Sequence, residues 1–133
     1  MTAEPAAILR VRSGAVLERV LERVVAALAA RADLPVDRVE EAQIVAGAIA
    51  DGARRHAVDG VVQVTMRVEP GRMDLAVGPL AAGSAERVVA ESAVPGVGVV
   101  LDRLTDAWRV EAMDDRQERL DVEIRGGGGA GGR

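Results

Sequence analysis

The sequence lacks several residue types, and each absence excludes a class of functional site. It contains no cysteine, which excludes a disulfide framework and a thiolate metal site. All 17 basic residues are arginine, so a P-loop lysine, a Schiff base and a lysine general base are excluded as well. Phenylalanine and tyrosine are absent, and the only aromatic residue is Trp108, so the chain offers no set of rings on which unpaired nucleic-acid bases could stack.

The charges that are present have the pattern of an ordinary soluble surface. The net charge is −4, and Arg is interspersed with Asp and Glu along the sequence. Because nucleic-acid-binding proteins cluster their basic charge, we expect no nucleic-acid partner. The apolar runs end well short of the roughly 20 residues that a membrane span requires, and the N-terminal segment lacks the features of a secretory signal. We therefore expect a cytoplasmic protein with no membrane partner.

The first half of the sequence predicts a strand followed by two helices. Residues Ala7–Arg12 alternate as a short strand does. Residues Ala15–Ala30 place apolar side chains on one helical face, and Ser13 stands where it can cap that helix. Residues Val36–Ala57 predict a second helix, which is richer in Ala and Gly than the first.

Two hairpins are predicted in the second half. Val62–Val68 and Met73–Val77 alternate apolar with polar residues, and Pro70-Gly71 between them suits a type II turn. Trp108–Ala112 and Leu120–Ile124 alternate in the same way on either side of a polar turn. Each pair therefore predicts two antiparallel strands.

The segment between the hairpins has a mixed pattern. Pro79–Gly83 is expected to be a loop, and Ser84–Glu91 a short helix capped by its serine. Val94–Gly98 is expected to be a turn that opens a third helix, which ends near Asp106.

This order of elements predicts an α/β (α+β) two-layer sandwich, in which three helices cover a mixed, mainly antiparallel sheet. We expect one domain over residues 1–125. The Gly-rich residues 126–133 are expected to be a disordered tail.

Three short motifs stand at defined places in this order. Leu34–Asp37 joins the two long helices, His56 ends the second helix before a turn and a hairpin, and Pro95–Asp106 places Gly96 and Gly98 before the third helix. Together with the element order, these motifs resemble the anti-sigma-factor serine kinases of the histidine kinase-like ATPase (GHKL, Bergerat-type) fold. In that family the glycines of the last motif let backbone amides at a helix start approach the phosphates of ATP.

The resemblance also implies a catalytic set, which this sequence does not carry. In the family, the second helix has the form E-A-x-x-N-A-x-x-H, with a Glu that activates the attacking hydroxyl and an Asn that holds the magnesium bound to ATP. Aligned on His56, these two positions are Ala48 and Gly52, and the chain contains no Asn. Asp51 is adjacent, but one residue turns about 100° around a helix, so its carboxylate is expected to point elsewhere.

The first glycine box of the family, V-x-D-x-G-x-G, is altered in the same way. Pro79 stands at the position of the Asp that reads the adenine amino group, and it offers neither a side-chain acceptor nor an N–H. The resemblance therefore implies a vestigial pocket without a metal ligand or a general base. Its residues would be Asp51, Gly52, Pro79, Gly83, Gly96 and Gly98.

The same residues also permit a structural interpretation. Ala48, Gly52 and His56 lie four residues apart on one helical stripe, where small residues would let the helix sit close to its neighbours. His56 has no partners at metal-ligand spacing and suits a helix end, where it interacts favourably with the dipole. Gly96 and Gly98 fit a turn before a helix as well as an anion site.

Three functions follow from these observations. The first is a degenerate anti-sigma-factor kinase-like regulator that binds a protein, such as a sigma factor or an anti-sigma antagonist, without ATP or any other cofactor. The second is an active ATP-dependent serine kinase with an altered Mg-ATP site, for which Asp51 is the nearby carboxylate. The third is a homodimerisation module or a sensor of another small ligand. We expect the first, because the Glu, the Asn and the base-reading Asp are lost together.

Overall fold

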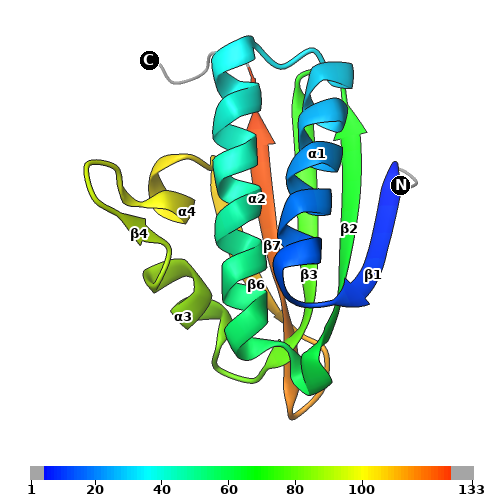
Figure 1. Cartoon of the computed structure of the whole chain (residues 1–133), viewed down its shortest axis with the longest axis vertical. Coiled ribbons are helices and arrows are strands. Elements are labelled where there is room, and N and C mark those ends of the chain that lie inside the picture. The colour runs from blue at the N-terminus through cyan, green and yellow to red at the C-terminus, as the bar shows by residue number, and fades with distance from the viewer. Residues whose placement is uncertain (1–4, 127–133) are drawn as a thin grey trace.

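The computed structural model of the chain describes residues 5–126 and follows the predicted element order (Figure 1). The strands are β1 (Ala7–Arg12), β2 (Val61–Glu69), β3 (Arg72–Ala81), β4 (Ala93–Val94), β5 (Gly98–Val99), β6 (Ala107–Ala112) and β7 (Gln117–Arg125). The helices are α1 (Ala15–Arg31), α2 (Val36–His56), α3 (Ala85–Ala90) and α4 (Val100–Arg103), with a 3-10 turn η1 (Val58–Gly60). The predicted disordered tail, apart from Gly126, lies outside the described residues.

Five strands form one sheet in the order β1-β2-β3-β7-β6, and α1 and α2 lie over one of its faces (Figure 1). This confirms the predicted two-layer sandwich. Every neighbouring pair of strands in this sheet is antiparallel, so among the described residues the sheet is more uniform than the mixed one expected. Within residues 5–126, no helix combines the length and the apolar character that crossing a membrane would need.

The core lies between the sheet and the two long helices. Alternate side chains of β2, β3 and β7 are buried on the helix side, as the period of two predicts. Helix α1 adds Leu17, Leu21 and Val25, which recur at helical spacing and are fully buried. Aliphatic side chains and methionine therefore fill this core without an aromatic centre.

Arg38 ties the start of α2 to the far end of the chain. Its guanidinium donates to the carbonyl oxygens of Arg125, at 2.9 Å, and Leu104, at 3.2 Å. It also donates to the carboxylates of Glu41 and Asp106, each at 2.7 Å. This one side chain thus joins α2 to segments that lie 66 to 87 residues further along the chain.

The segment between the two hairpins differs from its prediction. The prediction of a loop over Pro79–Gly83 is wrong in its first part, because β3 continues to Ala81. After a register shift between Val77 and Leu80, this strand resumes its pairing with β7. The third helix, predicted to end near Asp106, is present but shorter, since α4 has only four residues and ends at Arg103. The residues before it form a small β4–β5 hairpin around the Pro95-Gly96 turn, in which Ala93 pairs with Val99 and Val94 pairs with Gly98.

Neither predicted serine cap is made by the serine hydroxyl. Ser13 Oγ donates instead to the Gly60 carbonyl, at 3.3 Å, and so joins the end of β1 to the start of β2. Ser84 does occupy the N-cap position of α3, but its hydroxyl donates back to a carbonyl oxygen of β3 at 2.6 Å. The carboxylate of Glu118 on β7 accepts the Ala85 N–H at 2.7 Å and so satisfies the helix start from 33 residues away.

Candidate functional site

The C-terminal part of α2 is in close contact with α3 at Gly52, which is buried. A Cβ added to Gly52 would stand 2.5 Å from Cγ1 and 2.9 Å from Cγ2 of Val88. These separations are much shorter than a van der Waals contact, so α3 can approach α2 this closely only because position 52 has no side chain. This is the close packing that the structural interpretation of the small-residue stripe predicts.

A small groove lies beside this contact, between α2 and the β4–β5 hairpin. Its volume is about 220 Å³, whereas small-molecule pockets usually measure about 300–1,000 Å³. Its lining is largely apolar, with the carboxyl groups of Asp51 and Glu91 as the acidic part. The lining residues are Ile44, Gly47, Ala48, Asp51, Glu91, Ser92, Ala93, Val94 and Val100.

The structure brings two of the sequence-predicted site positions to this groove. Ala48 and Asp51 line it, and Gly52 lies next to it beneath Val88. Pro79 is elsewhere, because it lines a hollow on the open face of the sheet, opposite the helices. The position expected to read an adenine therefore does not face the position expected to hold magnesium.

The three other predicted glycines share a left-handed backbone conformation. Gly83, Gly96 and Gly98 have φ values of 84°, 84° and 94°, a left-handed conformation that favours glycine. Gly83 precedes α3, whereas Gly96 and Gly98 belong to the β4–β5 hairpin.

Ser92 accepts hydrogen bonds from the backbone N–H groups that the second glycine box would offer to a phosphate. The Val100 N–H donates to the Ser92 carbonyl at 3.2 Å, and the Leu101 N–H donates to Ser92 Oγ at 3.3 Å. Ser92 is itself buried and donates its hydroxyl to the Val89 carbonyl at 2.6 Å. The first amides of α4 are therefore satisfied within the chain.

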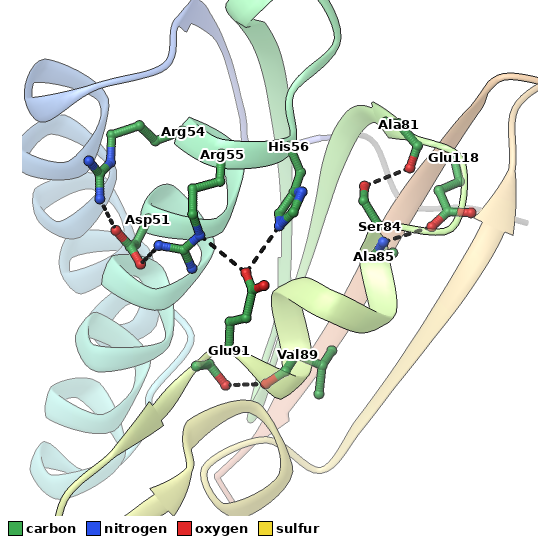
Figure 2. Close-up of polar contacts among 11 residues, drawn as sticks. Asp51, Arg54, Arg55, His56, Ala81, Ser84, Ala85, Val89, Glu91 and Glu118 are labelled. Carbon is green, nitrogen blue, oxygen red and sulfur yellow. Dashed lines mark hydrogen bonds and ion pairs between the residues drawn. The ribbon is translucent and has the colours of Figure 1, made fainter.

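A chain of charged side chains joins the last turn of α2 to the end of α3 (Figure 2). Asp51 accepts hydrogen bonds from Arg54 at 2.5 Å and from Arg55 at 2.7 Å. Glu91 Oε1 accepts from Arg55 Nε at 3.1 Å and lies 3.0 Å from His56 Nε2. His56 is thus a helix-end residue, as expected, and its partner comes from the segment after α3.

These contacts lower the pKa of both carboxyl groups. The hydrogen bond from Arg54, followed by that from Arg55, lowers the pKa of Asp51 below its ordinary value. The hydrogen bond from His56, followed by that from Arg55, lowers the pKa of Glu91. A general base works best with a pKa near the operating pH, so both groups are moved away from that role. Their arrangement suits them to holding α2 and α3 together.

Because its pKa is lowered, Glu91 should contribute to the free energy of unfolding by an amount that depends on pH. The folded state holds the Glu91 proton more weakly than the unfolded chain, so this contribution is present above the ordinary value of 4.5. It is lost as the pH falls from there through the lowered pKa of the folded state. In denaturant unfolding at a series of pH values, Glu91→Gln should be less stable than the wild type near neutrality, and the difference should shrink in acid. A difference that stays constant with pH would show that the Glu91 contacts do not form.

A larger hollow, of about 1,060 Å³, follows the open face of the sheet. Several of its charges already have partners within the face. Arg119 donates to Asp121 at 2.7 Å, and Arg72 donates to Asp74 at 3.1 Å. It is a broad surface of mixed polar and apolar residues on the face of the antiparallel sheet that the helices leave open.

Sequence reasoning missed Glu91 and Ser92, which do most to shape the site. Glu91 lies 35 residues after His56, and no local pattern signals their pairing. The burial of Ser92 depends on the unpredicted β4–β5 hairpin. Within residues 5–126, no three side chains among His, Asp and Glu are grouped so that they could hold a metal ion.

Comparison with protein-family models and with curated proteins found no match. Among solved structures, the chain is similar to a chain in the crystal structure of the SiaB–SiaC complex from Pseudomonas aeruginosa. The TM-score is 0.60 at 8% sequence identity, over 90% of this chain and 89% of that chain. At this identity the likeness concerns the fold, which the two chains share over most of their length. Membership of the GHKL family stays a prediction.

Proposed function

We propose that the chain is a non-catalytic, anti-sigma-factor kinase-like regulator that acts in the cytoplasm by binding a protein partner. The contact between Gly52 and Val88 carries this proposal. At the position where the resembling family places its magnesium-binding Asn, the fold has no side chain and no room for one. A helix that once lined a nucleotide site would in this way have become a packing surface.

The residues around the groove do not fit Mg-ATP. Ala48 has no group that could accept a proton. Asp51 is engaged by Arg54 and Arg55, and the amides at the start of α4 are engaged by Ser92. The groove volume of about 220 Å³ is also small for a nucleotide. These four observations support binding as the activity, and they disfavour the active kinase with Asp51 as its magnesium ligand.

The proposed partner is a protein of the sigma-factor or anti-sigma-antagonist class, which is what the sequence resemblance implies. The SiaB–SiaC structure is a complex of two proteins, and this supports a protein as the binding partner. The likeness of fold covers most of the chain, which fits a single regulatory domain over residues 1–125.

A thermal-shift experiment tests the proposal. Magnesium with ATP should leave the melting temperature of the full chain unchanged, compared with magnesium alone. A ligand at 100 times its dissociation constant would add about 2.7 kcal/mol, which is a shift of several degrees for a domain of this size. A melting temperature that rises and saturates with ATP concentration would overturn the proposal.

A further inference from the structure

The segment of β1 and α1 carries arginines that contact no carboxylate among the described residues. Residues 5–31 contain five arginines and two glutamates, although the whole chain has a net charge of −4. No side chain of these five makes an ion pair or hydrogen bond with another described residue. By contrast, Arg38, Arg54 and Arg55 of α2 all contact carboxylates. The unpaired arginines are Arg10, Arg12, Arg19, Arg23 and Arg31.

β1 is an edge strand whose core-facing side is incompletely covered. Among residues 5–126 it pairs only with β2, so no described strand covers its other edge. Ala7, Leu9 and Val11 lie opposite fully buried residues of β2 and contact the core, yet they are only half-buried. Figure 1 shows the reason, because β1 emerges to one side of α1, on the side away from α2.

The side of α1 away from α2 is apolar and exposed. Glu22 marks the side that faces α2, because its carboxylate lies 2.9 Å from the point where a Cβ of Gly47 would stand. Val20 is about 160° around the helix from Glu22, and Val16 and Val24 lie one turn to either side of it. Val16 is 61% exposed and Val20 is 36% exposed.

These two apolar surfaces meet along the free edge of the sheet, and we call them together the β1 shelf. Its floor is Ala7, Leu9 and Val11 on β1, and its wall is Val16, Val20, Val24 and Ala27 on α1.

Positive charge borders the β1 shelf on both sides. Arg10 and Arg12 are exposed on the opposite face of β1, where their cross-strand neighbours are Gln63 and Val61 and no carboxylate. On α1, Arg23 is exposed and falls beside the valine stripe. The shelf thus combines an open strand edge, an apolar floor and wall, and unpaired guanidinium groups.

Charge argues against a second copy of this chain on the shelf. Two β1 strands paired edge to edge would bring the arginines of both copies together on one face, and like charges across strands are destabilising. Charged side chains on edge strands commonly prevent such self-pairing. The same arginines would attract a strand that carries acidic side chains.

We propose that the β1 shelf docks a strand of a protein partner in which apolar residues alternate with Asp or Glu. The strand pairs with the free edge of β1 through main-chain hydrogen bonds. Its apolar side chains lie on Leu9 and Val11 beside the α1 valines, and its carboxylates lie on the other face beside Arg10 and Arg12. This rests on the proposed function in one respect, since it takes the partner to be a protein.

A short capped peptide of alternating Val and Glu tests this inference, with a Val–Lys peptide as its comparison. Titrated into isotope-labelled full chain, the Val–Glu peptide should give saturable chemical-shift changes in β1 and on the outer side of α1. The Val–Lys peptide should give none there. Absence of saturable changes with the Val–Glu peptide, changes confined to other elements, or equal binding of both peptides would overturn the inference.

Charge reversal supplies the decisive variants. Arg10→Glu combined with Arg12→Glu should weaken binding of the Val–Glu peptide about tenfold or more and create binding of the Val–Lys peptide. Arg109→Glu, which makes the same exposed change on β6 at the opposite edge, should leave both affinities unchanged. If sedimentation shows that the wild-type chain pairs with itself and that the double variant does not, the occupant is a second copy and the inference is wrong.

The two proposals can fail separately. A melting temperature raised by Mg-ATP would overturn the proposed function and leave the peptide result standing. A peptide that fails to bind would overturn the docking inference and leave the nucleotide result unchanged.

Discussion

Gly52→Ala should destabilise the fold by about 1–3 kcal/mol, although alanine is the better helix former. A methyl group at this position would stand 2.5 Å from Val88 Cγ1, and both residues are buried. Helix α3 would have to move away from α2 to admit it. The cost of that movement should exceed the roughly 1 kcal/mol that replacing glycine contributes to an exposed helix. The free energy of unfolding in urea measures the net effect.

Gly47→Ala in the same helix is the matched control, and its expected effect has the opposite sign. A Cβ at Gly47 would stand 2.9 Å from the end of the Glu22 side chain, which is flexible and can shift. The variant should therefore gain up to about 1 kcal/mol of stability.

Val88→Ala supplies a second check on the same contact. Combined with Gly52→Ala, it should be less destabilising than the sum of the two single variants, because the smaller side chain accommodates the new methyl group. A Gly52→Ala variant as harmless as Gly47→Ala would mean that position 52 is open, as a ligand site would require.

Arg38→Ala should cost about 2–3 kcal/mol, because it removes a charged donor from four acceptors, three of which lie outside α2. The Arg38 side chain is only 20% exposed, so water cannot readily replace these contacts. Arg54→Ala is the control on the same helix. That side chain is 60% exposed and makes one ion pair within its own helix, so the loss should be below about 0.5 kcal/mol. Equal losses in urea unfolding would contradict the bridging role of Arg38.

The elements with a strong repeating pattern were predictable from the sequence. α2 begins at Val36 as predicted and ends one residue earlier than expected, at His56. Both hairpins pair as the alternation of apolar residues indicates. These elements bury one continuous face, so burial and local pattern agree.

The site was less predictable, because long-range contacts form it. The spacing of Ala48, Gly52 and His56 indicated a small-residue stripe, but it could not show that Val88 would fill the space above Gly52. Glu118 on β7 accepts a hydrogen bond from a backbone N–H at the start of α3. Ser92 accepts hydrogen bonds from backbone amides that a glycine motif alone would leave free. Each of these contacts depends on tertiary packing.

A titration of isotope-labelled full chain with Mg-ATP tests whether the nucleotide site is lost, because it reports on each residue separately. We expect no saturable chemical-shift change at Ala48, Gly52, Gly96 or Gly98 when Mg-ATP is added to millimolar concentration. Saturable changes at Gly52 together with Gly96 and Gly98 would contradict this expectation, since they would show that the helix and the glycine turn still form a nucleotide site.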